Sequence, residues 1–267
     1  MPIRPLKIPA YLETQQYDGQ WFLDHIDEIR EGIKRLHSDQ ADVTVSIPAY
    51  NEEASILKTL WSLSKTVTSQ KVEILVVNNN STDRTQELIE LSGASWLIEK
   101  QQGVTHARNS GLQAAKGKII LNADADSFYS PYWVDLLSLP LKDATVACTY
   151  GRFAFVSDGP ANRFPYFLYE TAGDFFKAIK RRSNDEAMYV YGCSSGYRKE
   201  QGLQVDGYHH PPDTNEDGYL ALKLRSKFGK LHKVTANRAL VWTSDRRLIE
   251  QGGLFKAFLA RTKFLFG

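Results

Sequence analysis

The sequence predicts an α/β protein with a mostly parallel, Rossmann-like central sheet flanked by helices. From residue 43 onward, short apolar runs suited to buried strands alternate with stretches of helical periodicity. This alternation is typical of βαβ units, in which a helix joins two parallel strands. In addition, the polar clusters of the chain follow directly after strands, which is where ligands bind in parallel sheets.

The first 41 residues are expected to form an N-terminal helical extension. Prolines punctuate the start of the chain, and the apolar residues of 21–37 recur at helical spacing. This spacing predicts one amphipathic helix.

The regular alternation fills the next part of the chain, about residues 42–128. Buried strands are expected at 43–48, 71–77, 95–100 and 118–122, and helices at 54–65, 85–92 and 104–116.

The pattern changes in the second half of the domain, about residues 129–247. Strands are expected at 145–151, 187–192 and 230–236, and helices at 162–182, which is rich in aromatic residues, and 216–229. The tail at 248–267 mixes phenylalanine with basic side chains and is expected to form a C-terminal amphipathic helix. We favour packing of this helix against the domain, with contact to an anionic membrane surface as the alternative.

Composition excludes several classes of protein. The 33 basic and 31 acidic residues leave a net charge of +2, so no overall field favours a nucleic-acid partner. Two cysteines cannot form a disulfide framework and are compatible with a reducing compartment. The chain shows no signal peptide and no apolar run long enough to span a bilayer, which predicts a cytoplasmic protein.

Two carboxylates, Asp124 and Asp126, follow the apolar strand at 118–122. Residues i and i+2 after such a strand point roughly the same way, so the two carboxylates can converge. Mg²⁺ and Mn²⁺ prefer carboxylate and phosphate oxygens and take few protein ligands when a substrate supplies phosphates. The pair therefore fits a metal–diphosphate site, although an Asp-x-Asp triplet taken alone is more often a turn or helix cap.

Two further polar turns, SIPAYNEE at 46–53 and VVNNNSTDRT at 76–85, also lie between a strand and a helix. Helix capping explains many of their polar residues, but not the Pro-Ala-Tyr sequence of the first turn. Because all three turns follow strands of one sheet, we expect them at the same edge, which is unusual for turns without a function.

In this order and spacing, the motifs resemble family 2 glycosyltransferases of the GT-A fold over most of residues 43–247. The matching segments are SIPAYNEE, VVNNNSTDRT, GVTHARNSGLQAAKGKIILNADADS, GCSSGYRKE at 192–200 and NEDGYLALKL at 215–224. The resemblance implies a GT-A domain at 42–247, with a nucleotide-binding half and an acceptor half that carries a smaller mixed sheet. It also implies a nucleotide-diphosphate sugar donor, Mn²⁺ or Mg²⁺, and inversion at the anomeric carbon.

The resemblance assigns roles to individual positions of the nucleotide-binding half. Direct metal coordination is assigned to Asp126, with Asp124 directed toward the ribose or a metal-bound water. The nucleotide-binding residues would be Pro48, Ala49, Tyr50, Glu52, Asn79, Arg108 and Asp124. The family usually has acidic residues where this chain has Asn78 and Asn79, so UDP is the favoured nucleotide, while GDP and dTDP stay open.

In the acceptor half, the resemblance makes Asp217 the general base and lets Glu216 position the acceptor or the base. Three small residues are expected to contact the acceptor or the donor sugar: Ser194, Ser195 and Gly196. Two further pairs of residues are also assigned roles, each with an ordinary surface role as its alternative. Arg246 and Arg247 would bind the diphosphate, and His209 or His210 would be a third metal ligand.

These residues are compatible with three functions: a glycosyltransferase, a nucleotidyltransferase, and a silent sugar-nucleotide or glycan-binding module. A single-addition transferase is favoured over a processive synthase, because the chain lacks membrane-spanning segments and a Gln-x-x-Arg-Trp motif. Its acceptor would be a saccharide or a lipid-linked molecule. A nucleotidyltransferase would need a Gly-rich basic loop after the first strand, and a silent sugar-nucleotide or glycan-binding module would not need Asp124, Asp126 and Asp217 together.

Overall fold

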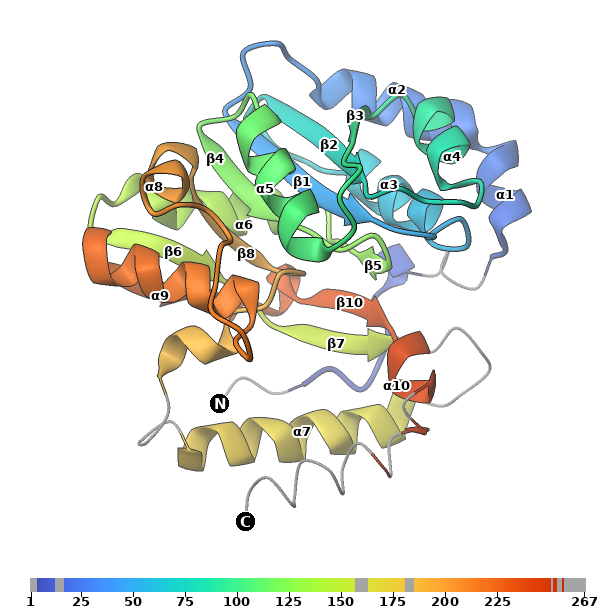
Figure 1. Ribbon diagram of the computed structural model, residues 1–267. Helices are drawn as coiled ribbons and strands as arrows, with labels where there is room; N and C mark the ends of the chain where they lie inside the picture. The colour runs from blue at the N-terminus through green and yellow to red at the C-terminus, as the bar shows by residue number, and fades with distance from the viewer. Residues whose placement is uncertain are drawn as a thin grey trace.

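The computed structural model describes residues 4–12, 17–156, 163–180 and 185–250, together with 252, 253 and 256. Within this part of the chain a seven-stranded sheet has the order β3-β2-β1-β4-β8-β6-β9 (Figure 1). All neighbouring strands are parallel except β8, which runs antiparallel to β4 and β6. The strands are β1 Val43–Ala49, β2 Val72–Asn78, β3 Ser95–Ile98, β4 Ile119–Asn122, β6 Val146–Tyr150, β8 Ser195–Arg198 and β9 Lys230–Lys233.

Helices cover both faces of this sheet, and each face has its own core. Alternate residues of a strand point to opposite faces; accordingly Ile74 and Val76 join one core and Leu75 joins the other. The first core includes residues of α3 Ile56–Ser64, α4 Thr85–Ser92 and α6 Trp133–Ser138, and the second those of α5 Val104–Ala114 and α9 Glu216–Phe228. The short helix α8 Lys199–Gln204 lies beside α5 and α9.

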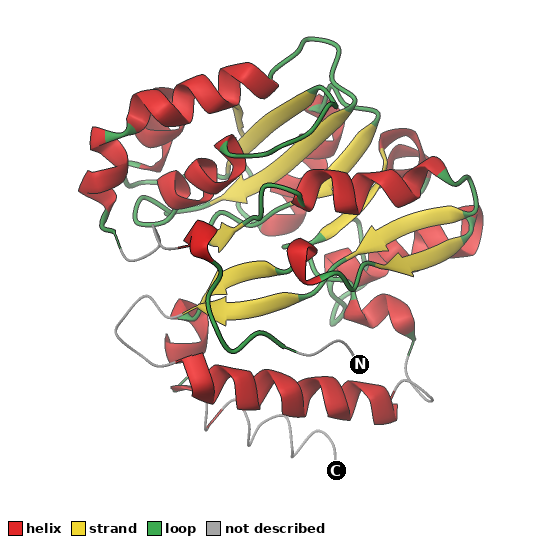
Figure 2. Cartoon of the chain, turned by 180° about the vertical axis from the view of Figure 1, so that it is seen from behind, coloured by secondary structure: helices red, strands yellow, loops and turns green. Residues whose placement is uncertain are grey.

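A second, mixed sheet of three strands, in the order β5-β10-β7, lies below the carboxyl end of the main sheet in Figure 1. Its strands are β5 Ser127–Phe128, β7 Phe153–Val156 and β10 Val241–Ser244, and β10 leads into α10 Arg246–Glu250. The long helix α7 Arg163–Lys180 runs beneath β7, as both views show (Figures 1 and 2). The mostly parallel sheet and the smaller mixed sheet confirm the predicted architecture.

The prediction of a strand at 187–192 is wrong. Residues Glu186–Tyr189 form a 3₁₀ helix, because the Asp185 side chain accepts a hydrogen bond from the backbone N–H of Ala187 and caps the turn. The strand lies further on, at Ser195–Arg198, inside the GCSSGYRKE motif.

The single helix predicted at 21–37 is two helices, α1 Gly19–Asp24 and α2 Ile26–Leu36, separated at His25. The ring of His25 stacks on Trp21 at 3.9 Å and its backbone leaves the helical region. Helix α2 buries Ile29, Ile33 and Leu36 in the core of the main sheet.

The expected C-terminal helix at 248–267 lies largely outside the described residues. No helix of the described part is both long and apolar enough to cross a membrane.

Candidate active site

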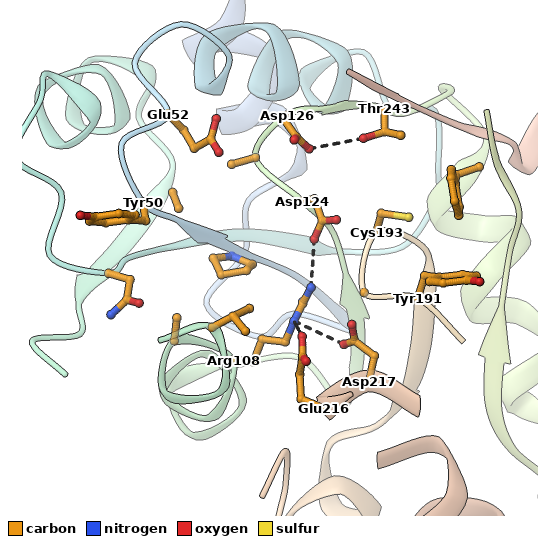
Figure 3. A pocket seen from close by; sticks show the side chains of 18 of the residues that line it. Tyr50, Glu52, Arg108, Asp124, Asp126, Tyr191, Cys193, Glu216, Asp217 and Thr243 are labelled. Carbon is orange, nitrogen blue, oxygen red and sulfur yellow. Dashed lines mark hydrogen bonds and ion pairs between the residues drawn. The ribbon is translucent and has the colours of Figure 1, made fainter. Parts of the chain in front are cut away.

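A pocket of about 830 Å³ opens where the carboxyl ends of β1, β2 and β4 face the second sheet (Figure 3). All seven positions expected to bind the nucleotide line its wall, together with the expected metal ligand Asp126 and the two residues expected to carry catalysis. These residues are Pro48, Ala49, Tyr50, Glu52, Asn79, Arg108, Asp124, Asp126, Glu216 and Asp217. The structure thus brings together side chains that are up to 169 residues apart, from Pro48 to Asp217.

The two polar turns of the nucleotide side hold each other in place. Asn51 adopts a left-handed backbone, which Asn tolerates well, and its Oδ1 accepts from the backbone N–H of Thr82 at 2.8 Å. In return the Asn51 N–H donates to Ser81 Oγ at 3.0 Å. Tyr50, 49% exposed, is left on the rim of the pocket with its ring accessible to a ligand.

Asn79 is fixed by the loop that leads to α5. Its Nδ2 donates to the carbonyls of Glu99 at 3.1 Å and Gln101 at 2.7 Å, and its Oδ1 accepts from the N–H of Gly103 at 2.8 Å. Asn78 likewise uses both ends of its amide, since it donates to Gln86 and accepts from Ser81. Aspartate at either position would lack the amide donor that the loops use.

Asp124 and Asp126 follow β4 and reach the pocket from one turn. The Asp124 N–H donates to the Tyr129 hydroxyl at 2.8 Å, and the Asp126 side chain is buried, with Ser127 Oγ at 3.4 Å and Thr243 Oγ1 at 3.5 Å as long contacts. Their carboxylates are hard donors that suit Mg²⁺ or Mn²⁺. The described residues contain no group of three or more metal-ligating His, Cys, Asp or Glu side chains, so a cation here would also need oxygens from substrate or water.

Arg108, on α5, stands between Asp124 on one side and Glu216 and Asp217 on the other (Figure 3). Its Nη2 donates to Asp124 Oδ1 at 2.9 Å, and its Nε lies 3.3 Å from Asp217 Oδ1 and 3.8 Å from Glu216 Oε1. Burial favours the neutral form, but the charges of Asp217 and Asp124 outweigh it and raise the pKa of Arg108. The guanidinium therefore stays charged.

Asp217 lies in the first turn of α9, where Asn215 caps the helix by accepting from the N–H of Gly218. Burial raises the pKa of the Asp217 carboxyl to about 7, while Arg108 and the backbone N–H of Gly192 act in the opposite direction. A side chain at Gly192 would collide with both Arg108 and Asp217. Glycine at this position therefore permits the ion pair to form.

Arg246, on α10, does not line this pocket but contacts two residues that do. Its Nη2 donates to both carboxylate oxygens of the buried Glu52, at 2.7 and 2.9 Å, and lies 3.9 Å from Asp126 Oδ2. These contacts bring Arg246 close to Asp126. The side chain of Arg247 lies outside the described part.

Some expected contacts are not at the pocket. Ser194 and Ser195 are buried and serve as partners of Trp133 Nε1 and Asn122 Nδ2, and Gly196 packs on Leu121 inside the sheet. None of these three residues lines the pocket, because Ser195 and Gly196 belong to β8, inside the main sheet, and Ser194 directly precedes it. Their contact with acceptor or donor sugar stays a prediction. The preceding residues Tyr191, Gly192 and Cys193 line the pocket instead.

The two histidines considered as a third metal ligand also lie elsewhere. His209 Nδ1 is 3.3 Å from exposed Asp206, and His210 Nε2 contacts Thr105 Oγ1 at 3.2 Å. Neither histidine lines the pocket, so the structure does not bring them to Asp126.

Sequence reasoning missed the aromatic side of the pocket and the segment before α5. The missed lining residues are Gln102, Gly103, Val104, Ala107, Ala125, Phe153, Phe155, Tyr169, Tyr191, Gly192, Cys193, Thr243 and Leu248. Aromatic enrichment at 153–169 was the available signal, but only the tertiary structure shows which rings face the cavity.

Comparisons with known proteins agree with this geometry. The family model described as glycosyl transferase family 2 matches residues 44–201. The chain is 36% identical over 224 residues to the hyaluronan synthase of Pasteurella multocida, a match that covers 80% of this chain and 22% of that protein. The chain spans about a third or less of the length of the curated relatives it matches, this synthase included.

Two solved structures share the fold. Glucosyl-3-phosphoglycerate synthase from Mycobacterium tuberculosis, in complex with Mn²⁺, UDP-glucose and phosphoglyceric acid, has a TM-score of 0.58 at 21% identity, covering 88% of this chain and 81% of that one. A mannosyltransferase from Pyrobaculum calidifontis, in complex with GDP-Man and Mn²⁺, has a TM-score of 0.56 at 19% identity, covering 87% and 66%. These likenesses confirm the GT-A fold.

Proposed function

Because the chain belongs to glycosyl transferase family 2, we propose that it transfers a sugar from a nucleotide-diphosphate sugar, with UDP favoured, to an acceptor hydroxyl with inversion. The similar proteins solved with UDP-glucose and GDP-Man support the donor class. The proposed donor site lies between Tyr50, on the rim, and the carboxylates after β4.

In this mechanism Asp217 takes the proton from the acceptor hydroxyl, which then attacks the anomeric carbon from the side opposite the diphosphate. A general base works best when its pKa lies near the operating pH, and burial raises the pKa of Asp217 to about 7. Arg108 holds the base in place together with Glu216, because its guanidinium lies within ion-pair distance of the carboxylates of both Asp217 and Glu216.

A divalent cation held by Asp126, with Asp124 beside it, would neutralise the charge that develops on the departing diphosphate. Asp124 has two roles in this proposal, since it also anchors Arg108. We also propose that Arg246, which pairs with Glu52, approaches the diphosphate when Glu52 engages the ligand.

The observation that carries the proposal is a set of buried polar atoms in the pocket wall without hydrogen-bond partners among the described residues: Arg108 Nε, Arg108 Nη1 and Asp217 Oδ1. Buried groups of this kind are costly unless a ligand or water satisfies them. A catalytically silent binding module would gain nothing from keeping a carboxyl of raised pKa beside these donors.

The decisive experiment is a panel of UDP-, GDP- and dTDP-sugars tested with Mn²⁺ by thermal shift and by release of nucleoside diphosphate. One donor should raise Tm and be hydrolysed slowly without acceptor. The anomeric configuration of a transferred sugar, read by NMR, tests inversion. Binding without release of diphosphate from any donor would instead favour the silent module, and release of pyrophosphate from a nucleoside triphosphate the nucleotidyltransferase.

A further inference from the structure

One side of the pocket is a continuous wall of aromatic rings. The centroids of Tyr191 and Phe153 are 5.2 Å apart, those of Phe153 and Phe155 5.5 Å, and those of Phe155 and Tyr169 6.2 Å. All four residues line the pocket, as does Leu248. We call these four rings the aromatic wall.

The aromatic wall is held in place by three separate elements of the fold. Phe153 and Phe155 project from β7, Tyr169 from α7 and Tyr191 from the turn that follows the 3₁₀ helix. Rings anchored from different directions form a preorganised surface, which loses little entropy when a ligand binds.

The aromatic wall lies on the base side of the pocket. Figure 3 shows Tyr191 and Tyr50 at opposite sides, with Asp124, Arg108 and Asp217 between them. Tyr191 is also the chain neighbour of Gly192, whose N–H is hydrogen-bonded to Asp217. A molecule on the aromatic wall would thus present its groups to Asp217 rather than to the nucleotide side.

We propose that the aromatic wall is a subsite for an uncharged pyranose ring, which makes the acceptor a neutral glycan; naming it the acceptor rests on the proposed function. A pyranose ring presents a face of C–H bonds, whose partial positive charge suits the negative face of an aromatic ring. Two of the four rings are tyrosines, so the surface is amphipathic, as a sugar is. A prenyl chain would meet aromatic rings on this side of the pocket; among the described lining residues, Leu248 and Val104 are the two branched aliphatic ones.

Charge disfavours an anionic occupant. Among the described residues that line the pocket, Arg108 is the only basic one, against five acidic ones: Glu52, Asp124, Asp126, Glu216 and Asp217. Arg108 already faces three of these carboxylates. A phosphate or carboxylate on the aromatic wall would therefore meet like charge, which is costly at close range.

Three arginines lie behind the aromatic wall, but they do not reverse this argument. Arg4 is paired with Asp174, Arg163 with Glu170, and Arg152 donates to the carbonyl of Thr235. None of the three arginines lines the pocket.

The test is saturation-transfer NMR with methyl pyranosides of glucose, galactose, mannose and N-acetylglucosamine, with UDP and Mn²⁺ present to fill the donor side. Glucose 6-phosphate and a prenyl phosphate serve as the charged and lipid probes. Donor hydrolysis is measured in parallel on the same protein.

Tyr191→Leu keeps an apolar side chain but removes the ring, whereas Tyr191→Phe keeps the ring. We expect Tyr191→Leu to weaken binding of the preferred methyl pyranoside by about three- to tenfold, with binding by Tyr191→Phe close to that of the wild type. Phe164→Leu is the matched control, because Phe164 lies on α7, is 51% exposed and does not line the pocket.

Saturable binding of a methyl pyranoside that Tyr191→Leu weakens supports the subsite, even if no donor is turned over; in that case only the proposed function fails. The subsite is overturned if no pyranoside binds, if a phosphorylated probe binds better, or if Tyr191→Leu binds as the wild type does while donor hydrolysis proceeds.

Discussion

The guanidinium of Arg108 and the carboxylate of Asp217 form a buried ion pair, with Nε 3.3 Å from Oδ1. The two atoms are within ion-pair distance but not aligned for a hydrogen bond. Arg108 binds Asp124 more closely, at 2.9 Å. The proposed base and the proposed metal side are therefore electrostatically coupled through one cation.

The first prediction concerns pH. Since Asp217 must be ionised to accept a proton and burial raises its pKa to about 7, kcat/KM should rise with pH up to about 7 and fall about tenfold per unit below it. The same shift means that the folded protein holds this proton more tightly than the unfolded chain. The stability contributed by Asp217 is thus full below pH 4 and is lost as pH rises toward about 7.

Asp217→Asn should lower transfer by about 10²–10⁴-fold while leaving donor binding nearly unchanged. Thermal shift with the donor checks binding, and the acidic limb of the residual pH profile should disappear. An Asp217→Asn variant with wild-type turnover would exclude Asp217 as the base.

The second prediction tests the ion pair itself. Arg108 lowers the pKa of Asp217 against the effect of burial, so Arg108→Gln should move the acidic limb of kcat/KM to higher pH by about one to three units. Loss of one partner of a buried pair should also cost about 3–5 kcal/mol of stability, so activity is measured well below the Tm of the variant.

Arg108→Lys is the control for this experiment, because it keeps the charge but loses the planar fork. Its pH profile should stay nearer to that of the wild type. If Arg108→Gln loses activity without any displacement of the profile, Arg108 acts on structure or donor binding rather than on the base.

The third prediction concerns the cation. Asp126 is buried at the pocket, and the described residues hold no alternative cluster of metal ligands. Mn²⁺ should therefore raise the Tm of the wild-type protein in the presence of UDP, and Asp126→Asn should abolish most of that rise. Chelation by EDTA should likewise remove transfer activity.

Asp27→Asn is the matched control for Asp126, since the Asp27 carboxylate is 83% exposed on α2. It should respond to Mn²⁺ as the wild type does. An undiminished Mn²⁺ response in Asp126→Asn would place the cation elsewhere.

The parts of the molecule that the sequence predicts well are those in which local pattern and tertiary environment agree. Strands β1, β2 and β4 are apolar runs buried on both faces, and the motif that follows each reaches the pocket. By contrast, β8 has the sequence SGYR, which carries no apolar run, although β4 is no longer than β8. Such a strand is stabilised by its partners across the sheet, and its own pattern carries little information.

The same reasoning explains why Ser194, Ser195 and Gly196 do not line the pocket. Of the GCSSGYRKE motif, the turn at Gly192 rather than the serines reaches the pocket, because the strand begins at Ser195. The register of a four-residue strand decides which end of a motif faces a ligand. That register is set by the pairing of β8 with β4 and β6.

The last prediction concerns Asn79, whose side-chain amide is held at both ends by the loop that leads to α5. Asn79 Nδ2 donates to two backbone carbonyls and Oδ1 accepts from Gly103. Asn79→Asp would replace the amide donor with an oxygen that faces those carbonyls, so it should lower the free energy of unfolding by about 1–3 kcal/mol, as measured in urea. Asn80→Asp is the control: Asn80 is exposed with φ 64°, a conformation that Asp also tolerates, and its stability should change little. Unchanged stability in Asn79→Asp, together with tighter UDP binding, would instead mean that position 79 is free to read the base and that the loop is held by other contacts.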